Sequence, residues 1–329
     1  MSLRLILFSC LVLILFSSAS VAQDDDPIRV ESSIVRLNVG VVDQRGRPIK
    51  DLTRADFTVF EDGVRQEIGK FEPSTAPFSV VMILDMSGST LGFRQVIKQS
   101  AMRFLDAIST QDRVAVVEFY DKIRLRNDFT TDRATVFNSI HQANGAGKSP
   151  VYKALDFALD KLAKEGTRRK AIVVLTDGRD TEVEANDTRT LEAIRDELVP
   201  TTIRPESEQI LNRVLGRSDA QGVTIYPLAL PSGDPYKLAD PTPRQIAKWS
   251  AARARLQIVA DRTGGTLNTI NALEDMGRLY AQVAADMRAL YTVEYTPTND
   301  RRDGKFRKIS ITVSNSEQIA RTRQGYFPR

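Results

Sequence analysis

The amino-acid sequence predicts an α/β fold: a doubly wound, mostly parallel sheet with a small flanking β domain. From Phe78 onward, short apolar runs alternate with helical patterns, which is typical of a doubly wound sheet. Two of these expected strands end in an aspartate, Asp85 and Asp177. On either side of this region the pattern is β only, over residues 28–71 and 291–327. A chain of 329 residues is long enough for one large domain and one small domain.

Residues 1–22 are expected to be a signal peptide. Arg4 precedes an apolar run from Leu5 to Phe16, and small residues ending at Ala22 offer a cleavage site. Cys10 lies inside the apolar run, which argues against lipidation, and it is the only cysteine, so the mature chain has no disulfide. We therefore expect an exported protein, periplasmic or extracellular. No other stretch is apolar enough to cross a membrane.

The N-terminal β segment is expected over residues 23–76. Between Val35 and Val41 every second residue is apolar, as in a half-buried strand. The run from Phe57 to Phe71, interrupted by a turn that ends at Gly63, predicts a hairpin. Residues 72–77 contain two prolines and have the composition of a linker.

The doubly wound domain is expected over residues 77–290. Its strands are expected near 79–84, 113–119, 122–126, 171–176, 223–229 and 265–269, with helices between them. Two loop-like stretches, 182–221 and 231–243, are longer than the connections need. They either border a ligand site or decorate an edge, and we favour decoration. A helix over residues 271–290 closes the domain.

The C-terminal segment, residues 291–329, returns to a β pattern with alternating apolar residues such as Tyr291, Val293 and Tyr295. Two or three strands alone are barely stable. We therefore expect this segment to pair with residues 28–71. The doubly wound domain would then be an insertion into the small β domain.

The charge balance gives no indication of nucleic-acid binding. The chain has 46 basic and 42 acidic residues, a net charge of +4, and no basic stripe interleaved with aromatic residues. Its 42% hydrophobic and 27% charged residues are ordinary for a soluble globular protein.

The run Val80–Thr90 contains the most informative residues of the chain. A buried strand ends at Asp85, and Ser87 and Ser89 follow at alternate positions. All three side chains offer oxygen only, which is the donor type that hard divalent cations such as Mg²⁺ prefer. The pattern alone equally fits a turn in which Asp85 or Ser87 caps a helix.

Two further elements favour a metal site. The apolar strand 170–176 ends at Asp177, and the glycine-rich loop 144–150 carries Ser149 to the start of a helix. With these elements the chain resembles a von Willebrand factor type A domain. The resemblance implies a metal-ion-dependent adhesion site formed by five residues: Asp85, Ser87, Ser89, Ser149 (at the family's threonine position) and Asp177. Replacement of that threonine by serine keeps the hydroxyl, whereas the charge of Lys148 beside it would weaken metal affinity.

The flanking segments resemble bacterial secreted proteins related to this family. The segments concerned are Asp51–Gly63, Tyr291–Pro297, Asp303–Ile309 and Arg323–Phe327. The resemblance therefore covers nearly the whole mature chain. The resemblance predicts the architecture of the chain better than it predicts the biological role of the protein.

Strand geometry supports the same site independently of the resemblance. In a doubly wound sheet with right-handed crossovers, the strands that end at Asp85 and Asp177 are expected to be neighbours where the strand order reverses. Adjacent strands lie about 4.8 Å apart. Two carboxylates at neighbouring carboxyl ends can therefore bracket one cation.

Other chemistry fits the sequence less well. The only histidine, His141, lies on an expected helix, and a general base needs a positioned nucleophile. A serine hydrolase needs a Gly-x-Ser-x-Gly turn, which residues 86–90 lack. A phosphoryl-transfer enzyme of the haloacid-dehalogenase type would carry a second aspartate where this chain has Ser87. We therefore expect no enzymatic activity.

The sequence thus predicts an exported, divalent-metal-dependent protein-binding module of the adhesion type. The cation is expected to be Mg²⁺, with Mn²⁺ or Ca²⁺ as alternatives. The resemblance implies that an aspartate or glutamate of a protein partner fills an open coordination position. The alternative is a structural scaffold of a cell-envelope complex, in which the metal only rigidifies the loops.

Overall fold

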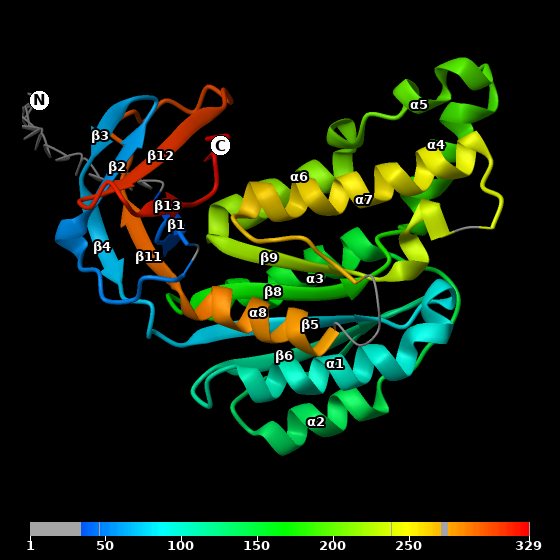
Figure 1. Cartoon of the computed structure of the whole chain (residues 1–329), viewed down its shortest axis with the longest axis horizontal. Helices are drawn as coiled ribbons and strands as arrows, with labels where there is room; N and C mark the ends of the chain where they lie inside the picture. The colour runs from blue at the N-terminus through cyan, green and yellow to red at the C-terminus, as the bar shows by residue number, and fades with distance from the viewer. Residues whose placement is uncertain (1–33, 46, 238, 271–275, 329) are drawn as a thin grey trace, which may run out of the picture. The chain divides into compact units, whose positions relative to one another are not determined.

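A computed structural model describes residues 34–45, 47–237, 239–270 and 276–328 of the chain (Figure 1). The expected signal peptide, residues 1–22, lies outside the described residues, as do residues 271–275 of the expected closing helix. Within the described segments, no helix combines the length and apolar character that crossing a membrane requires.

A six-stranded sheet, mostly parallel, forms the centre of the larger part of the fold, in the order β10-β9-β8-β5-β6-β7. Its strands are β5 (Phe78–Asp85), β6 (Arg113–Phe119), β7 (Ile123–Thr130), β8 (Arg169–Thr176), β9 (Val223–Ala229) and β10 (Asn268–Thr269). Only β7 is antiparallel to its neighbour. The chain adds strands on one side of β5 and then on the other, so β5 and β8 are the neighbouring strands at which the order reverses, as predicted.

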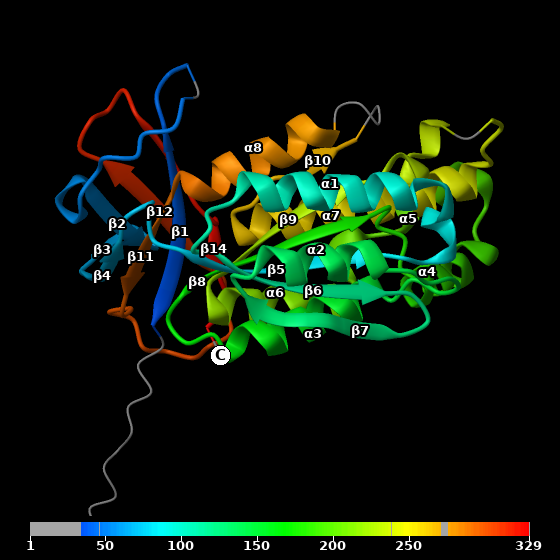
Figure 2. The same cartoon turned by 90° about the horizontal axis from the view of Figure 1, so that it is seen from below.

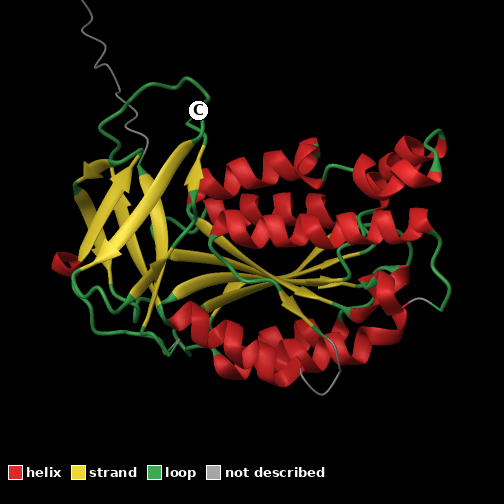
Figure 3. Cartoon of the chain, turned by 45° about the horizontal axis from the view of Figure 1, so that its top comes forward, coloured by secondary structure: helices red, strands yellow, loops and turns green. Residues whose placement is uncertain are grey.

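Helices cover both faces of this sheet (Figure 3). The main helices are α1 (Arg94–Ala107), α2 (Arg133–Gln142), α3 (Val151–Ala163), α4 (Thr181–Glu192), α5 (Val199–Thr202), α6 (Gln209–Gln221), α7 (Pro243–Thr263) and α8 (Met276–Arg288). Helices α1, α2 and α8 share one buried cluster with the sheet, and α3, α6 and α7 share the other.

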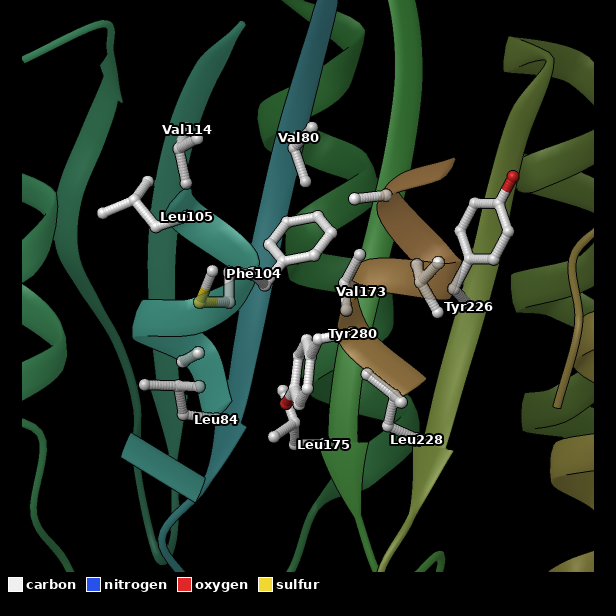
Figure 4. Close-up of a cluster of buried hydrophobic side chains, with 14 of the residues drawn as sticks. Val80, Leu84, Phe104, Leu105, Val114, Val173, Leu175, Tyr226, Leu228 and Tyr280 are labelled. Carbon is white, nitrogen blue, oxygen red and sulfur yellow. The ribbon is translucent and has the colours of Figure 1, made fainter. Parts of the chain in front are cut away.

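The central strands supply both clusters because successive side chains point to opposite faces. Val80, Met82 and Leu84 of β5 belong to the cluster under α1 and α8, whereas Val81 and Ile83 belong to the other. Figure 4 shows side chains from neighbouring strands packed with aromatic rings in the first cluster. This two-sided burial is why the strands are continuous apolar runs in the sequence.

Two antiparallel four-stranded sheets form the flanking β unit, in the orders β13-β1-β11-β4 and β14-β12-β2-β3. Their strands are β1 (Val35–Val42), β2 (Phe57–Glu61), β3 (Val64–Gln66), β4 (Ile68–Glu72), β11 (Leu290–Tyr295), β12 (Arg307–Val313), β13 (Ile319–Arg321) and β14 (Gly325–Tyr326). Figure 2 shows these strands gathered at one end of the described chain. The fold class is therefore confirmed: a mostly parallel sheet with antiparallel sheets beside it.

Strands from both ends of the sequence pair in each of these two sheets. In the first, Val39 of β1 pairs with Tyr291 of β11; in the second, Val59 of β2 pairs with Ile311 of β12. Apolar side chains from both sheets share one buried cluster. Neither segment makes this core by itself.

Three details differ from the sequence-based expectation. Strand β7 continues to Thr130, beyond its expected end near residue 126. Strand β10 has two residues where five were expected, because Gly264 ends α7 in a left-handed conformation (φ 78°) and Gly265 passes against the carbonyl of Ile225. The stretch 182–221, expected to be loop-like, is instead largely helical, with most of α4 and all of α5 and α6. Helix α4 starts at Thr181 because the Asp180 side chain accepts hydrogen bonds from the backbone N–H groups of Glu182 and Val183.

Candidate metal centre

The first part of the site is the turn that follows β5. Asp85 is fully buried at the carboxyl end of the strand, and its Oδ1 accepts a hydrogen bond from the backbone N–H of Ser87 at 3.0 Å. The hydroxyl of Thr90 donates to the carbonyls of Asp85 and Ser87, at 2.8 and 3.1 Å. These contacts close the turn, and they bring the hydroxyl oxygens of Ser87 and Ser89 within 3.3 Å of each other.

The second part is the loop before α3, which contributes Ser149. The Ser149 hydroxyl lies 3.4 Å from Oδ2 of Asp85. The loop contacts the first turn directly, because the N–H of Gly88 donates to the carbonyl of Gly147 at 2.9 Å. It is tied to the start of α4 by two hydrogen bonds between Ser149 and Thr181.

Glycine is required at position 147. Its φ is 94°, and a Cβ atom there would lie 2.4 Å from a carboxylate oxygen of Asp121. That carboxylate accepts a hydrogen bond from the backbone N–H of Lys148, at 2.7 Å. Asp121 thus orders the loop that carries Ser149.

The third part is Asp177, which directly follows β8. It is fully buried, and its Oδ1 accepts a hydrogen bond from the N–H of Arg179 at 3.1 Å. The side chain of Ser89 also hydrogen-bonds to this carboxylate. The structure therefore brings all five sequence-predicted residues together at one edge of the sheet.

Two hydroxyl residues of the site were missed by the sequence analysis. Thr176 donates a hydrogen bond of 2.6 Å to Oδ2 of Asp85, and Ser232 lies 3.4 Å from Oδ2 of Asp177. Thr176 is the last residue of β8 and directly precedes Asp177, so the sequence already placed it close to the site. Ser232 belongs to the stretch 231–243, for which the sequence favours a decorative role; at this residue the stretch instead borders the site.

Two buried acids dominate the electrostatics of the site, and the positive charge of Arg179 offsets part of the charge on Asp177. Burial, and after it the nearby Asp177 carboxylate, together raise the pKa of Asp85 to about 7. Burial likewise raises the pKa of Asp177. Among the described residues, neither carboxylate forms an ion pair. A cation between the two carboxylates would supply further positive charge.

The donor set fits a hard divalent cation. Two carboxylates and the hydroxyls of Ser87, Ser89 and Ser149 offer only oxygen, as Mg²⁺ requires. A bound ion would supply positive charge and an open position for a further oxygen ligand. In the described part of the chain, no group of three or more His, Cys, Asp or Glu residues is placed to hold a metal ion.

This combination of a doubly wound sheet and an oxygen-donor site at its switch point defines a class of ligand-binding α/β domain. Residues 80–179 match the family model of the von Willebrand factor type A domain, and this stretch runs from β5 past Asp177. The chain thus contains a von Willebrand factor type A domain. No curated protein matches the sequence.

Several solved structures are similar to the chain at low sequence identity. A von Willebrand factor type A protein from Catenulispora acidiphila is 12% identical, with 91% of this chain and 74% of that chain covered and a TM-score of 0.48. The von Willebrand factor domain of the type V pili tip protein Mfa5 from Porphyromonas gingivalis is 15% identical, with 64% and 94% covered and a TM-score of 0.46.

A third similar structure is proximal thread matrix protein 1 from the mussel byssus, described with a zinc-occupied MIDAS (metal-ion-dependent adhesion site) motif. It is 13% identical, with 68% of this chain and 48% of that chain covered and a TM-score of 0.46.

Proposed function

We propose that the chain is an exported protein whose type A domain binds a divalent cation, Mg²⁺ in the first place, and through it a carboxylate of a protein partner. Type A domains are protein-interaction modules, and the family model covers the stretch that holds the candidate site. The observation that carries the proposal is the pair of buried carboxylates, Asp85 and Asp177, on neighbouring strands and surrounded by hydroxyls.

Each residue has a separate role in this proposal. The hydroxyls of Ser87, Ser89 and Ser149 are neutral ligands, while Asp85 and Asp177 supply charge, directly or through water. Three neutral donors leave the cation electrophilic, so it retains affinity for a further anionic oxygen. We propose binding and no catalysis, because position 87 is a serine where a phosphoryl-transfer enzyme of this strand arrangement would have its general acid.

Calorimetric titration with Mg²⁺ and Mn²⁺ tests the metal site. We expect Asp85→Ala and Asp177→Ala to keep their fold and to lower metal affinity more than about 100-fold, because ligand loss should exceed the 10- to 100-fold effect of outer-shell changes. Ser149→Ala, which removes a neutral donor, should lower it less. The control is Asp106→Ala, an exposed carboxylate on α1. Wild-type metal binding by a folded Asp85→Ala variant would refute the site.

The binding role is separated from the scaffold alternative by a chelator. A partner held through the metal should be released by EDTA, whereas a scaffold contact should persist.

Export is tested by mass spectrometry of the protein recovered from a bacterial host. A mature N-terminus at Gln23 in the exported fraction is expected, and an intact Met1 in the cytosolic fraction would contradict export.

A further inference from the structure

The connection that follows β9 is fastened to the candidate metal centre. The N–H of Leu230 donates to the carbonyl of Thr176 at 2.9 Å, and the Ser232 hydroxyl lies 3.4 Å from Oδ2 of Asp177. Gly233 approaches so closely that a Cβ atom on it would lie 2.1 Å from the carbonyl oxygen of Asp177. Only a glycine fits this contact.

The same connection has a fixed path beyond these contacts. Residues Pro231–Gly233 and Pro235–Lys237 form two short 3-10 turns, and each begins with a proline that sets its own φ. The Asp234 side chain accepts a hydrogen bond from the N–H of Tyr236 at 3.0 Å. From α7, Arg253 donates to the carbonyl of Leu230 at 3.4 Å. These hydrogen bonds and the two prolines restrict the conformations that the connection can adopt.

This ordered loop presents a large aromatic side chain to solvent. Tyr236 is 84% exposed, the highest value for a large hydrophobic side chain among the described residues. It follows Gly233 by three residues, so its Cα lies within about 11 Å of a residue that touches Asp177. A side chain so exposed contributes little to the core, and an exposed aromatic residue close to a polar site is typical of a binding contact.

Two other exposed side chains stand beside the same site. Leu91 is 55% exposed and follows Ser89 by two residues. Lys148 is exposed and directly precedes Ser149; its ammonium group has no ion-pair partner among the described residues. The rim of the site thus combines apolar surface with a positive charge, which complements an acidic residue that has apolar neighbours.

We propose that residues 231–236 form the partner-recognition loop of the metal centre, and that Tyr236 contacts a large apolar side chain adjacent to the partner's coordinating carboxylate. The partner is therefore a protein segment in which an aspartate or glutamate lies next to an aromatic or large aliphatic residue. This inference rests on the proposed function: the metal captures the carboxylate, and Tyr236 selects its neighbour.

An array of immobilised nonapeptides tests the proposal. Each peptide has a central aspartate in a glycine–serine background, with phenylalanine, leucine or serine beside it, and a matched series has asparagine at the centre. In Mg²⁺ the purified chain should prefer the aspartate peptides with phenylalanine or leucine over those with serine by about tenfold, a contribution expected of one buried aromatic contact. EDTA should abolish the binding.

The variants assign this preference to Tyr236. Tyr236→Ala should reduce the preference to less than twofold and leave Mg²⁺ affinity unchanged, whereas Tyr236→Phe should retain it. The control is Phe137→Ala, which removes another exposed aromatic, on α2. If Tyr236→Ala keeps the wild-type preference, the recognition role is overturned while the proposed function stands. If the wild type binds no aspartate peptide above its asparagine match in Mg²⁺, the proposed function itself fails.

Discussion

Arg169, the first residue of β8, joins the type A domain to the flanking β unit. It is 1% exposed. One terminal nitrogen donates to the carbonyls of Ser74 and Ala76, at 2.9 and 3.1 Å, in the connection before β5. The other donates to Met287 at 3.3 Å and to Leu290, where α8 passes into β11. Arg169 thus binds both segments in which the chain passes between the type A domain and the flanking β unit.

Replacing Arg169 by methionine should destabilise the protein by about 3–5 kcal/mol, because four backbone carbonyls lose a charged hydrogen-bond donor. A hydrogen bond from a charged donor contributes about 1.5–3 kcal/mol, so four bonds set an upper limit of about 6–12 kcal/mol. The net loss is smaller because the buried guanidinium has itself given up hydration. Burial lowers its pKa to about 10, so it is still charged at neutral pH. Methionine fills part of the volume, but it leaves the four carbonyls without this donor.

Urea unfolding of the wild type and Arg169→Met, followed by circular dichroism, measures this difference. The matched control is Arg168→Met at the adjacent position. Arg168 also donates to two carbonyls, those of Phe78 and Gln111, but it is only partly buried. Because water can replace much of what these bonds contribute, we expect a loss of about 1 kcal/mol or less. A loss below 1 kcal/mol for Arg169→Met, or equal losses for the two variants, would refute this account of the junction.

Three further predictions concern the site and the β unit. Thr176→Val should lower Mg²⁺ affinity about 10- to 100-fold in calorimetry, because Asp85 loses an orienting hydrogen bond; unchanged affinity would remove Thr176 from the site. Apparent Mg²⁺ affinity should fall as the pH is lowered through about 7, since protonation of Asp85 competes with the metal; equal affinity at pH 6 and pH 8 would contradict this. Deletion of residues 291–329 removes β11 and β12, which pair with β1 and β2, and should expose residues 34–71 to protease; continued protection would show that residues 34–71 fold without the C-terminal segment.

The central strands could be predicted from the sequence because strands buried on both faces are continuous runs of apolar residues, and such runs are visible in the local sequence. Strands β6 and β9 begin and end where the apolar runs predicted. The position of Asp85 and Asp177 on neighbouring strands followed from the alternation of strands and helices alone. The burial of the strands on both faces and the reversal of strand order in doubly wound sheets were sufficient to predict these features.

The contacts of Thr176 and Ser232 could not be derived in the same way. The hydrogen bond from Thr176 to Asp85 depends on the register of β8 against β5, in which Leu84 pairs with Leu175. Register is a property of two strands, and neither apolar run specifies it by itself. The contact of Ser232 with Asp177 depends on the close approach of Gly233, which is a matter of tertiary fit. The composition of a loop does not show what the loop lies against.

The junction at Arg169 and the candidate metal centre lie at opposite edges of the central sheet. Arg169 begins β8 and Asp177 follows its last residue, and eight residues of strand span about 26 Å. Both chain crossings to the β unit lie at the edge of the sheet where β8 begins. The loops around Asp85, Ser149 and Asp177 lie at the opposite edge, where β8 ends. Substitutions so far apart, with no shared partner, should act additively. Arg169→Met should therefore change stability without changing metal affinity. If it weakened metal binding in the folded protein, the two edges would be energetically coupled, with β8 and the helices packed on it as the connecting elements.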